Sequence, residues 1–199
     1  MNVVHLGSEY GGWWIDLDAV RDGDTVLDIG VGHDVSFALE LLKHRKVRII
    51  LIDPSEESRS VAAGVPGSQF ICAAVTAVDG HRRLYQHASR QTSASLCPDN
   101  RNVSEETFDI VPCLALWKLI DEFRPSLVKM DIEGEEYACY RDCFSVRQVA
   151  IEFHHRLMVK KTPQYTEDAI ADFRSHHYEV IHRSEHDDVT FLSRYWLQK

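Results

Sequence analysis

Two acidic residues and a histidine at the ends of apolar runs are the side chains best placed for chemistry. Asp131 ends an apolar run of strand length. Glu152 and His154 stand two residues apart at the end of another run, so on an extended strand their side chains point the same way. A histidine with a pKa near neutral can take the proton of a hydroxyl group. We therefore predict that Asp131, Glu152 and His154 are catalytic, and that the pKa of His154 best suits a general base.

The same side chains have two other interpretations. Two carboxylates and an imidazole can bind a divalent metal ion, but their spacing along this chain is not diagnostic, and we predict no metal ligands. Glu152 and His154 can also form a polar cluster at a helix start. Glu133 and Glu135, which follow the fourth apolar run, can stabilise the first turn of a helix by their negative charge.

A second set of residues fits a nucleotide-containing cofactor. The stretch V-L-D-I-G-V-G places Asp28, Gly30 and Gly32 between an apolar run and an amphipathic stretch. Glycines there let the backbone approach a ligand, and the following helix offers free N–H groups. Asp53 ends the next apolar run, where a carboxylate can accept both ribose hydroxyls. Val35 stands in place of the third glycine of a dinucleotide-binding turn, which argues against NAD.

These residues need a sheet that brings strand ends together. Short apolar runs alternate with amphipathic stretches, a pattern that predicts an α/β fold with a mostly parallel sheet. We expect strands over residues 25–29, 47–52, 69–75, 126–131 and 148–153, and a final antiparallel pair over 178–182 and 189–193. We expect helices over residues 114–123 and 133–143, one from Thr166 to His176, and others after the first two strands.

The segment 76–112 departs from this alternation. Asp79-Gly80 predicts a tight turn, and residues 83–86 can form the return arm of a hairpin. Residues 89–106 are polar and are predicted to form a long loop, which in a compact domain often binds or covers a ligand. We therefore predict one domain over residues 1–199, in which 1–24 form an N-terminal cap and 76–112 an inserted hairpin and substrate lid.

Composition narrows the class of protein. Of the 199 residues, 44% are hydrophobic and 27% charged, which is typical of a globular domain. Acidic residues outnumber Lys and Arg by 31 to 22, whereas nucleic-acid binders usually carry a basic face, so we expect no nucleic-acid partner. We expect no signal peptide, and the sequence has no apolar run of membrane-spanning length and no C-x-x-C among its five cysteines. We expect a cytoplasmic protein without a membrane partner.

Four motifs, taken in order, resemble the FkbM-type methyltransferases. They are D-I-G from Asp28, D-P at 53–54, K-M-D-I-E-G-E from Lys129 and I-E-F-H ending at His154. The third is the most specific, and the resemblance covers residues 25–193. The family usually reads D-I-G-A-N-x-G in the first motif, where this chain has D-I-G-V-G-H-D.

The resemblance implies a class I Rossmann-like fold, with a seven-stranded sheet whose last strand is antiparallel and with helices on both faces. It implies S-adenosylmethionine as the methyl donor and a hydroxyl acceptor on a saccharide or other small molecule. The residues that we expect to hold the methionine part, the ribose and the adenine of this cofactor are Asp28, Gly30, Gly32, Asp53, Ala73 and Ala74.

Two other classes of protein stay open. A nicotinamide-dependent oxidoreductase would place Asp53 on a ribose in the same way, although the missing third glycine argues against it. A non-catalytic nucleotide-binding module would need the fold without the acids and histidine at its strand ends. We therefore predict a methyltransferase that uses S-adenosylmethionine and O-methylates a small molecule or saccharide.

Overall fold

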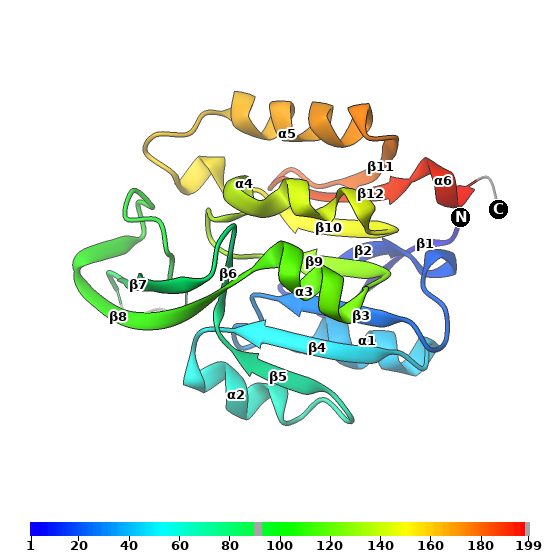
Figure 1. The fold of residues 1–199 in the computed structure, drawn as a ribbon, viewed down its shortest axis with the longest axis horizontal. Helices are drawn as coiled ribbons and strands as arrows, with labels where there is room; N and C mark the ends of the chain where they lie inside the picture. Colours follow the sequence, from blue (N-terminus) through cyan, green and yellow to red (C-terminus); the bar gives the residue numbers. More distant parts are fainter. Residues whose placement is uncertain (90–92, 198–199) are drawn as a thin grey trace.

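A seven-stranded sheet forms the centre of the molecule in the computed structural model, which describes residues 1–89 and 93–197 (Figure 1). Its strands are β3 (Thr25–Ile29), β4 (Arg48–Asp53), β5 (Gln69–Cys72), β9 (Leu127–Met130), β10 (Gln148–Glu152), β11 (Tyr178–Arg183) and β12 (Asp188–Ser193). The strand order is β11-β12-β10-β9-β3-β4-β5. β12 runs antiparallel to both of its neighbours, whereas β10, β9, β3, β4 and β5 pair in parallel. This confirms the predicted fold class.

Helices cover both faces of this sheet. On one face lie α1 (Ser36–His44) and α2 (Glu56–Ala62), whose apolar side chains pack against β4. On the other face lie α3 (Leu116–Phe123), α4 (Glu136–Cys139), the 3-10 helix η2 (Tyr140–Ser145) and α5 (Pro163–Ser175) (Figure 1). The short elements η1 (Leu17–Ala19), η3 (His155–Leu157) and α6 (Arg194–Leu197) complete the helices that the structure describes. None of the helices in the described ranges is long and apolar enough to cross a membrane.

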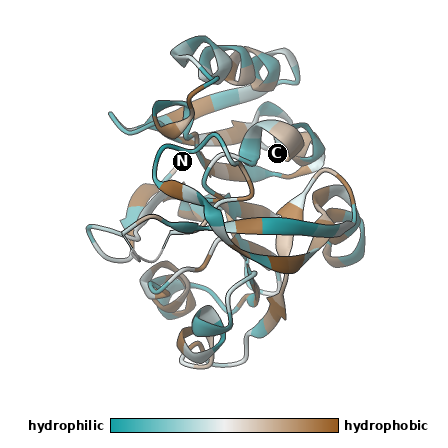
Figure 2. Cartoon of the chain, turned by 90° about the vertical axis from the view of Figure 1, so that its left-hand side faces the viewer, coloured by the Kyte–Doolittle hydropathy of each residue, from teal (hydrophilic) through white to brown (hydrophobic). Residues whose placement is uncertain are grey.

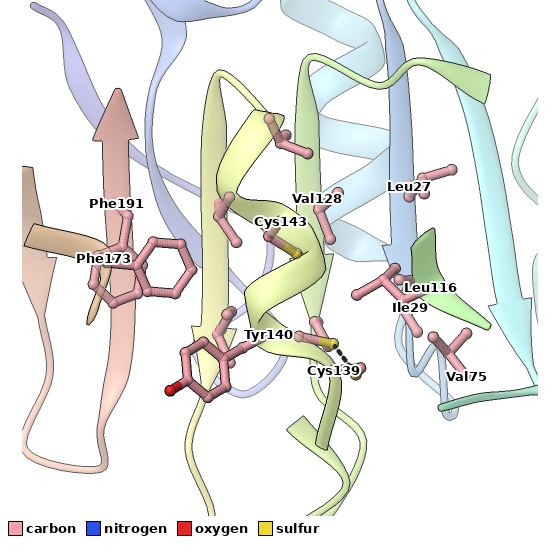
Figure 3. Close-up of a cluster of buried hydrophobic side chains, with 14 of the residues drawn as sticks. Leu27, Ile29, Val75, Leu116, Val128, Cys139, Tyr140, Cys143, Phe173 and Phe191 are labelled. Carbon is pink, nitrogen blue, oxygen red and sulfur yellow. Dashed lines mark hydrogen bonds between the residues drawn. The ribbon is translucent and has the colours of Figure 1, made fainter. Parts of the chain in front are cut away.

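The larger core lies between the sheet and the second helical layer (Figure 3). Phe173 of α5 stacks on Phe191 of β12, with 3.9 Å between the ring centroids and 13° between the planes. Tyr140, Cys139 and Cys143 fill the space between the helices and the central strands. The strands β3, β4, β9 and β10 are almost fully buried, as parallel strands covered by two helical layers require, and this is why their sequences are almost continuously apolar.

The first 24 residues add a small antiparallel sheet of β1 (Val3–Leu6) and β2 (Trp13–Asp16). Trp13 and Ile15 are buried and belong to the same apolar cluster as Phe37 of α1 and Leu127 of β9. This segment therefore covers the part of the α1 face that the helices leave open.

A three-stranded sheet extends the molecule beyond the carboxyl ends of the central strands (Figures 1 and 2). It consists of β6 (Ala74–Thr76), β7 (Gly80–His87) and β8 (Val103–Ala115), with β8 in the middle. The single strand predicted over 69–75 is wrong, because the chain leaves the main sheet at Ala73 and joins this second sheet.

The predicted loop over 89–106 is also longer than the observed one. β8 begins at Val103 and pairs with β7, so the last residues of that segment are a strand. Its first half is exposed and polar, which gave it the composition of a loop. Residues 90–92, inside the predicted loop and lid, lie outside the described residues.

Two helices begin at other residues than predicted. Glu133 and Gly134 have φ of +56° and +114°, so neither can start a right-handed helix, and α4 begins at Glu136. α5 begins at Pro163, a residue that suits the first helical position because it lacks an N–H. Thr166, the predicted cap, is buried, and its hydroxyl contacts Tyr137 and a histidine instead.

Candidate active site

A cavity of about 810 Å³ opens at the carboxyl ends of β3, β4, β9 and β10. These ends face the β7–β8 hairpin, which crosses the front of the molecule in Figure 2. The N-terminal segment 9–14, residues 93, 94 and 96, and residues of β11, β12 and the turn between them form other parts of the wall. The cavity gathers most of the predicted site residues, namely Gly30, Gly32, Asp53, Ala73, Ala74, Asp131, Glu152 and His154.

Gly30 turns the chain where β3 and β9 come closest together. Its φ is +78°, and a Cβ atom added to it would lie 1.6 Å from the carbonyl oxygen of Asp131. The Gly30 N–H donates to the carbonyl of Ile52 at 2.9 Å, which ties the turn to β4. Only glycine fits this close approach, and the approach sets Asp131 beside the cofactor turn.

The residues around Asp53 fit the ribose and adenine of the expected cofactor. The Asp53 carboxylate accepts the N–H groups of Gly32 at 3.0 Å and Ser55 at 2.8 Å, and these contacts hold it at the cavity wall. Ala73 and Ala74 line the same wall with small side chains. A fixed carboxylate beside a shallow apolar surface suits a nucleoside, with the hydroxyls on the acid.

Asp34 fixes the start of α1 at the same wall. Its carboxylate accepts the N–H of Ser36 at 2.7 Å and the hydroxyl of Ser8 at 2.5 Å. Burial alone would raise the pKa of Asp34, but these hydrogen bonds outweigh it and lower the pKa. Asp34 therefore stays charged and joins the N-terminal segment to the cofactor turn.

Asp28 does not line the cavity within the described part of the chain, and its direct contact with the cofactor stays a prediction. It is buried behind the turn, with Oδ1 3.2 Å from Nζ of Lys129. Lys129 does line the cavity and donates to the carbonyl of Gly30 at 2.7 Å. Burial lowers the pKa of Lys129, but the charges of Asp28 and Asp131 outweigh it and raise that pKa. Asp28 contacts the site through Lys129, a residue for which no role was predicted.

The three predicted catalytic side chains converge from β9 and β10. Nε2 of His154 lies 3.3 Å from Oε1 of Glu152 and 3.5 Å from Oδ1 of Asp131. Nδ1 of the same ring lies 2.7 Å from Oε1 of Glu136, a fully buried residue. Glu152 also forms an ion pair with Arg156. Glu136 and Arg156 were not predicted to belong to the site.

The charges around His154 affect its pKa. Burial would lower the pKa of His154, but Glu136 and Glu152 raise it well above the ordinary value. A raised pKa does not favour the predicted role of His154 as a base at neutral pH, and that role stays a prediction. Burial and the charge of Glu152 raise the pKa of Asp131 to about 7. The side chain of Asp131 is 32% exposed, whereas that of His154 is 2% exposed.

Part of the predicted lid is fixed against the site. The hydroxyl of Ser95 donates to the carbonyl of Glu133 at 2.6 Å, and the amide of Asn100 donates to the same oxygen at 3.2 Å. Arg82 of β7 forms an ion pair with Glu135. These contacts make the loop a wall of the cavity, beside the turn that follows β9.

The sequence matches a family model described as the methyltransferase FkbM domain, over residues 18–185. The chain belongs to the FkbM methyltransferase family. The resemblance carried by the four motifs is therefore confirmed, and so is S-adenosylmethionine as the cofactor. Membership also decides against the nicotinamide-dependent oxidoreductase. A search of curated proteins found no match.

Solved structures share the fold at low sequence identity. A fibrillarin/Nop5p complex aligns with a TM-score of 0.51 and 11% identity, over 86% of this chain and 72% of that one. Fibrillarin of Methanococcus jannaschii aligns with a TM-score of 0.48 and 9% identity, over 87% and 67%. An rRNA methylase from Streptococcus thermophilus aligns with a TM-score of 0.47 and 10% identity, over 89% and 90%. At these identities the likeness shows the fold alone.

The predicted partners, a small-molecule or saccharide acceptor and no nucleic acid, are wrong. Among the solved structures that share the fold is fibrillarin in a complex with Nop5p. The prediction used the net charge of −9, a sum over the chain that does not describe any one surface. An acidic composition gives no ground for excluding nucleic acid or protein.

Proposed function

We propose that this methyltransferase transfers the methyl group of S-adenosylmethionine to a hydroxyl oxygen of its acceptor. The observation that carries the proposal is the convergence of Asp131, Glu152 and His154 on the cavity beside the Gly30 turn. A hydroxyl group has to lose its proton as its oxygen is alkylated, whereas a neutral amine attacks through a free lone pair. A carboxylate beside the acceptor therefore favours oxygen.

Asp131 is the side chain that we assign as the base. It is the most exposed of the three, and its carboxylate accepts no hydrogen bond from the residues described. Glu152 is paired with Arg156, and His154 is almost completely buried. Asp131 can thus take the proton of a hydroxyl group held in the cavity, while Glu152 and His154 position it.

The remaining residues of the site bind the cofactor and align it with the acceptor. S-adenosylmethionine, when bound, supplies an electrophilic methyl group on a positively charged sulfur. Asp53 and the Gly30 turn fix the cofactor at one end of the cavity, and Asp131 fixes the acceptor oxygen at the other. Alignment of this kind contributes much of the rate of an in-line displacement.

The experiment that tests this proposal identifies the methylated atom. Methyl-labelled S-adenosylmethionine is incubated with the full chain and, separately, with the metabolite, RNA and protein fractions of a cell extract. We expect label on oxygen in one fraction, identified by digestion and mass spectrometry. Asp131→Asn should lower the rate by about 10²–10⁴ without changing the Kd for S-adenosylhomocysteine.

Asp172→Asn is the matched control, because it removes one carboxylate outside the cavity and should keep the full rate. Label on nitrogen or carbon would contradict O-methylation. A full rate in Asp131→Asn would remove Asp131 as the base.

A further inference from the structure

The side chains that meet at the ends of β9 and β10 also form a set of metal ligands. Asp131, Glu152 and His154 each offer one ligand atom, and these atoms all lie within 4.8 Å of one another. Two of the separations are 3.3 Å and 3.5 Å, both measured from Nε2 of His154. Ligand atoms about 2.1 Å from a tetrahedral or octahedral ion lie about 3.0–3.4 Å apart. The two distances from His154 therefore support a metal site, which the spacing of the three residues along the sequence did not indicate.

An independent observation concerns the other side of the histidine ring. Nδ1 of His154 lies 2.7 Å from the carboxylate of Glu136, which is itself held by the N–H groups of Ile132 at 3.1 Å and Gly134 at 3.0 Å. An acceptor at Nδ1 keeps one ring proton there, so a cation that binds Nε2 has to displace only the second proton of the ring. Nε2 makes no directed hydrogen bond to the described residues, although the side chain is 2% exposed. In metal-binding histidines, the ring nitrogen that does not bind the metal commonly donates a hydrogen bond to a carboxylate.

The ligand set has an open side. All three residues line the cavity, and part of the Asp131 side chain is exposed there. Catalytic metal sites keep positions for water or substrate, whereas structural sites are closed by protein ligands. Two oxygens and one imidazole nitrogen suit a divalent first-row ion such as Mn²⁺. Arg156 competes with such an ion, because it pairs with Glu152.

We propose that Asp131, Glu152 and His154 bind one divalent cation, and that this cation takes the acceptor hydroxyl oxygen as a further ligand. The role of the acceptor rests on the proposed function, whereas the binding site does not. With the cation bound, Asp131 is a ligand and no longer the base, and the cation would activate the hydroxyl group by lowering its pKa.

The atoms balance in this arrangement. The bond between oxygen and the methyl carbon forms as the bond between sulfur and that carbon breaks. The hydroxyl proton passes to Glu133, a second carboxylate of the cavity wall whose Oε2 lies 3.9 Å from Nε2 of His154. The cation keeps its charge, and no oxidant or reductant is needed.

The test is calorimetric titration of the EDTA-treated full chain with Mn²⁺, with loss of the free Mn²⁺ paramagnetic resonance signal as a second readout. We expect one Mn²⁺ per chain. Asp131→Asn should weaken binding by at least about 100-fold and Glu136→Gln by about 10–100-fold. Arg156→Gln should strengthen binding, because it removes the competing cation. Asp172→Asn is the control for the lost charge and should bind as the unmodified protein does.

Three results would overturn the inference. They are the absence of Mn²⁺ binding, binding that Asp131→Asn leaves unchanged, and equal weakening by Asp131→Asn and Asp172→Asn. S-adenosylhomocysteine is titrated into the same samples. If it binds where Mn²⁺ does not, the cation site fails and the proposed function stands. If Mn²⁺ binds and the methylated atom is not oxygen, the proposed function fails and the cation site stands.

Discussion

Replacement of Gly30 by alanine tests why the cofactor turn needs glycine. The added Cβ atom would meet the Asp131 carbonyl oxygen at 1.6 Å, so the ends of β3 and β9 would have to separate. The positive φ costs an alanine about 1–2 kcal/mol, and overpacking against backbone adds about 1–3 kcal/mol. We therefore expect Gly30→Ala to lower the free energy of unfolding by about 2–5 kcal/mol.

Two other glycines distinguish the cost of the positive φ from the cost of the close contact with Asp131. Gly32 and Gly67 have φ of +54° and +70°, and a Cβ atom added to either would have no neighbour within 4 Å among the described residues. Each alanine variant should therefore lose about 1–2 kcal/mol, from the backbone conformation alone.

Urea unfolding with linear extrapolation measures all three variants, and calorimetry gives the Kd for S-adenosylhomocysteine. We expect Gly30→Ala to weaken binding more than tenfold, and Gly67→Ala to leave it unchanged because Gly67 does not line the cavity. Equal destabilisation by Gly30→Ala and Gly67→Ala would refute the argument from close approach.

Two further predictions concern stability outside the cavity. Phe173→Ala should lower the free energy of unfolding by about 3–5 kcal/mol, because it empties the space beside Phe191, and should leave the Kd for S-adenosylhomocysteine unchanged. A weaker Kd would show that this core also positions the site. Hydrogen bonding from Tyr140, assisted by Arg141, lowers the pKa of Asp172 below its usual 3.8. The stabilising contribution of the Asp172 carboxylate is therefore present above that pH and is lost as the pH falls through the pKa of the folded state. Asp172→Asn should cost about 1 kcal/mol at pH 7, measured by urea unfolding, and the difference should shrink below about pH 4; a constant difference would contradict this assignment.

The central strands could be predicted because burial on both faces requires an almost continuously apolar sequence. The run 25–29 matches β3 at both ends, and β4, β9 and β10 begin and end within a residue of the predicted runs. A parallel strand between two helical layers must be apolar on both faces, so its sequence reads as one apolar run.

The second sheet could not be predicted in this way. The first half of β8 has exposed polar side chains, and what makes it a strand is its pairing with β7. The segment 69–75 is one apolar run, and only the three-dimensional course of the chain divides it between two sheets. Neither feature alters the local composition.

Part of the candidate site could be predicted from the sequence, and part of it depends on the three-dimensional course of the chain. Asp131, Glu152 and His154 could be brought together from the sequence, because the carboxyl ends of neighbouring parallel strands meet at one edge. The contact between Glu136 and His154 could not, because Glu136 lies beyond the strand end, after a turn in which Glu133 has a positive φ that the sequence did not indicate. The carboxylate of Glu136 in turn raises the pKa of His154, an effect that the sequence alone did not indicate.

The most direct test of the account is calorimetric titration of the full chain with S-adenosylhomocysteine, beside Asp53→Asn and with NAD as a second ligand. We expect a Kd of about 1–10 μM for S-adenosylhomocysteine and no heat from NAD. Asp53→Asn should bind about tenfold more weakly, since it loses a charged acceptor for the ribose hydroxyls. Binding of NAD alone, or equal affinity in Asp53→Asn, would contradict a cofactor site at these strand ends.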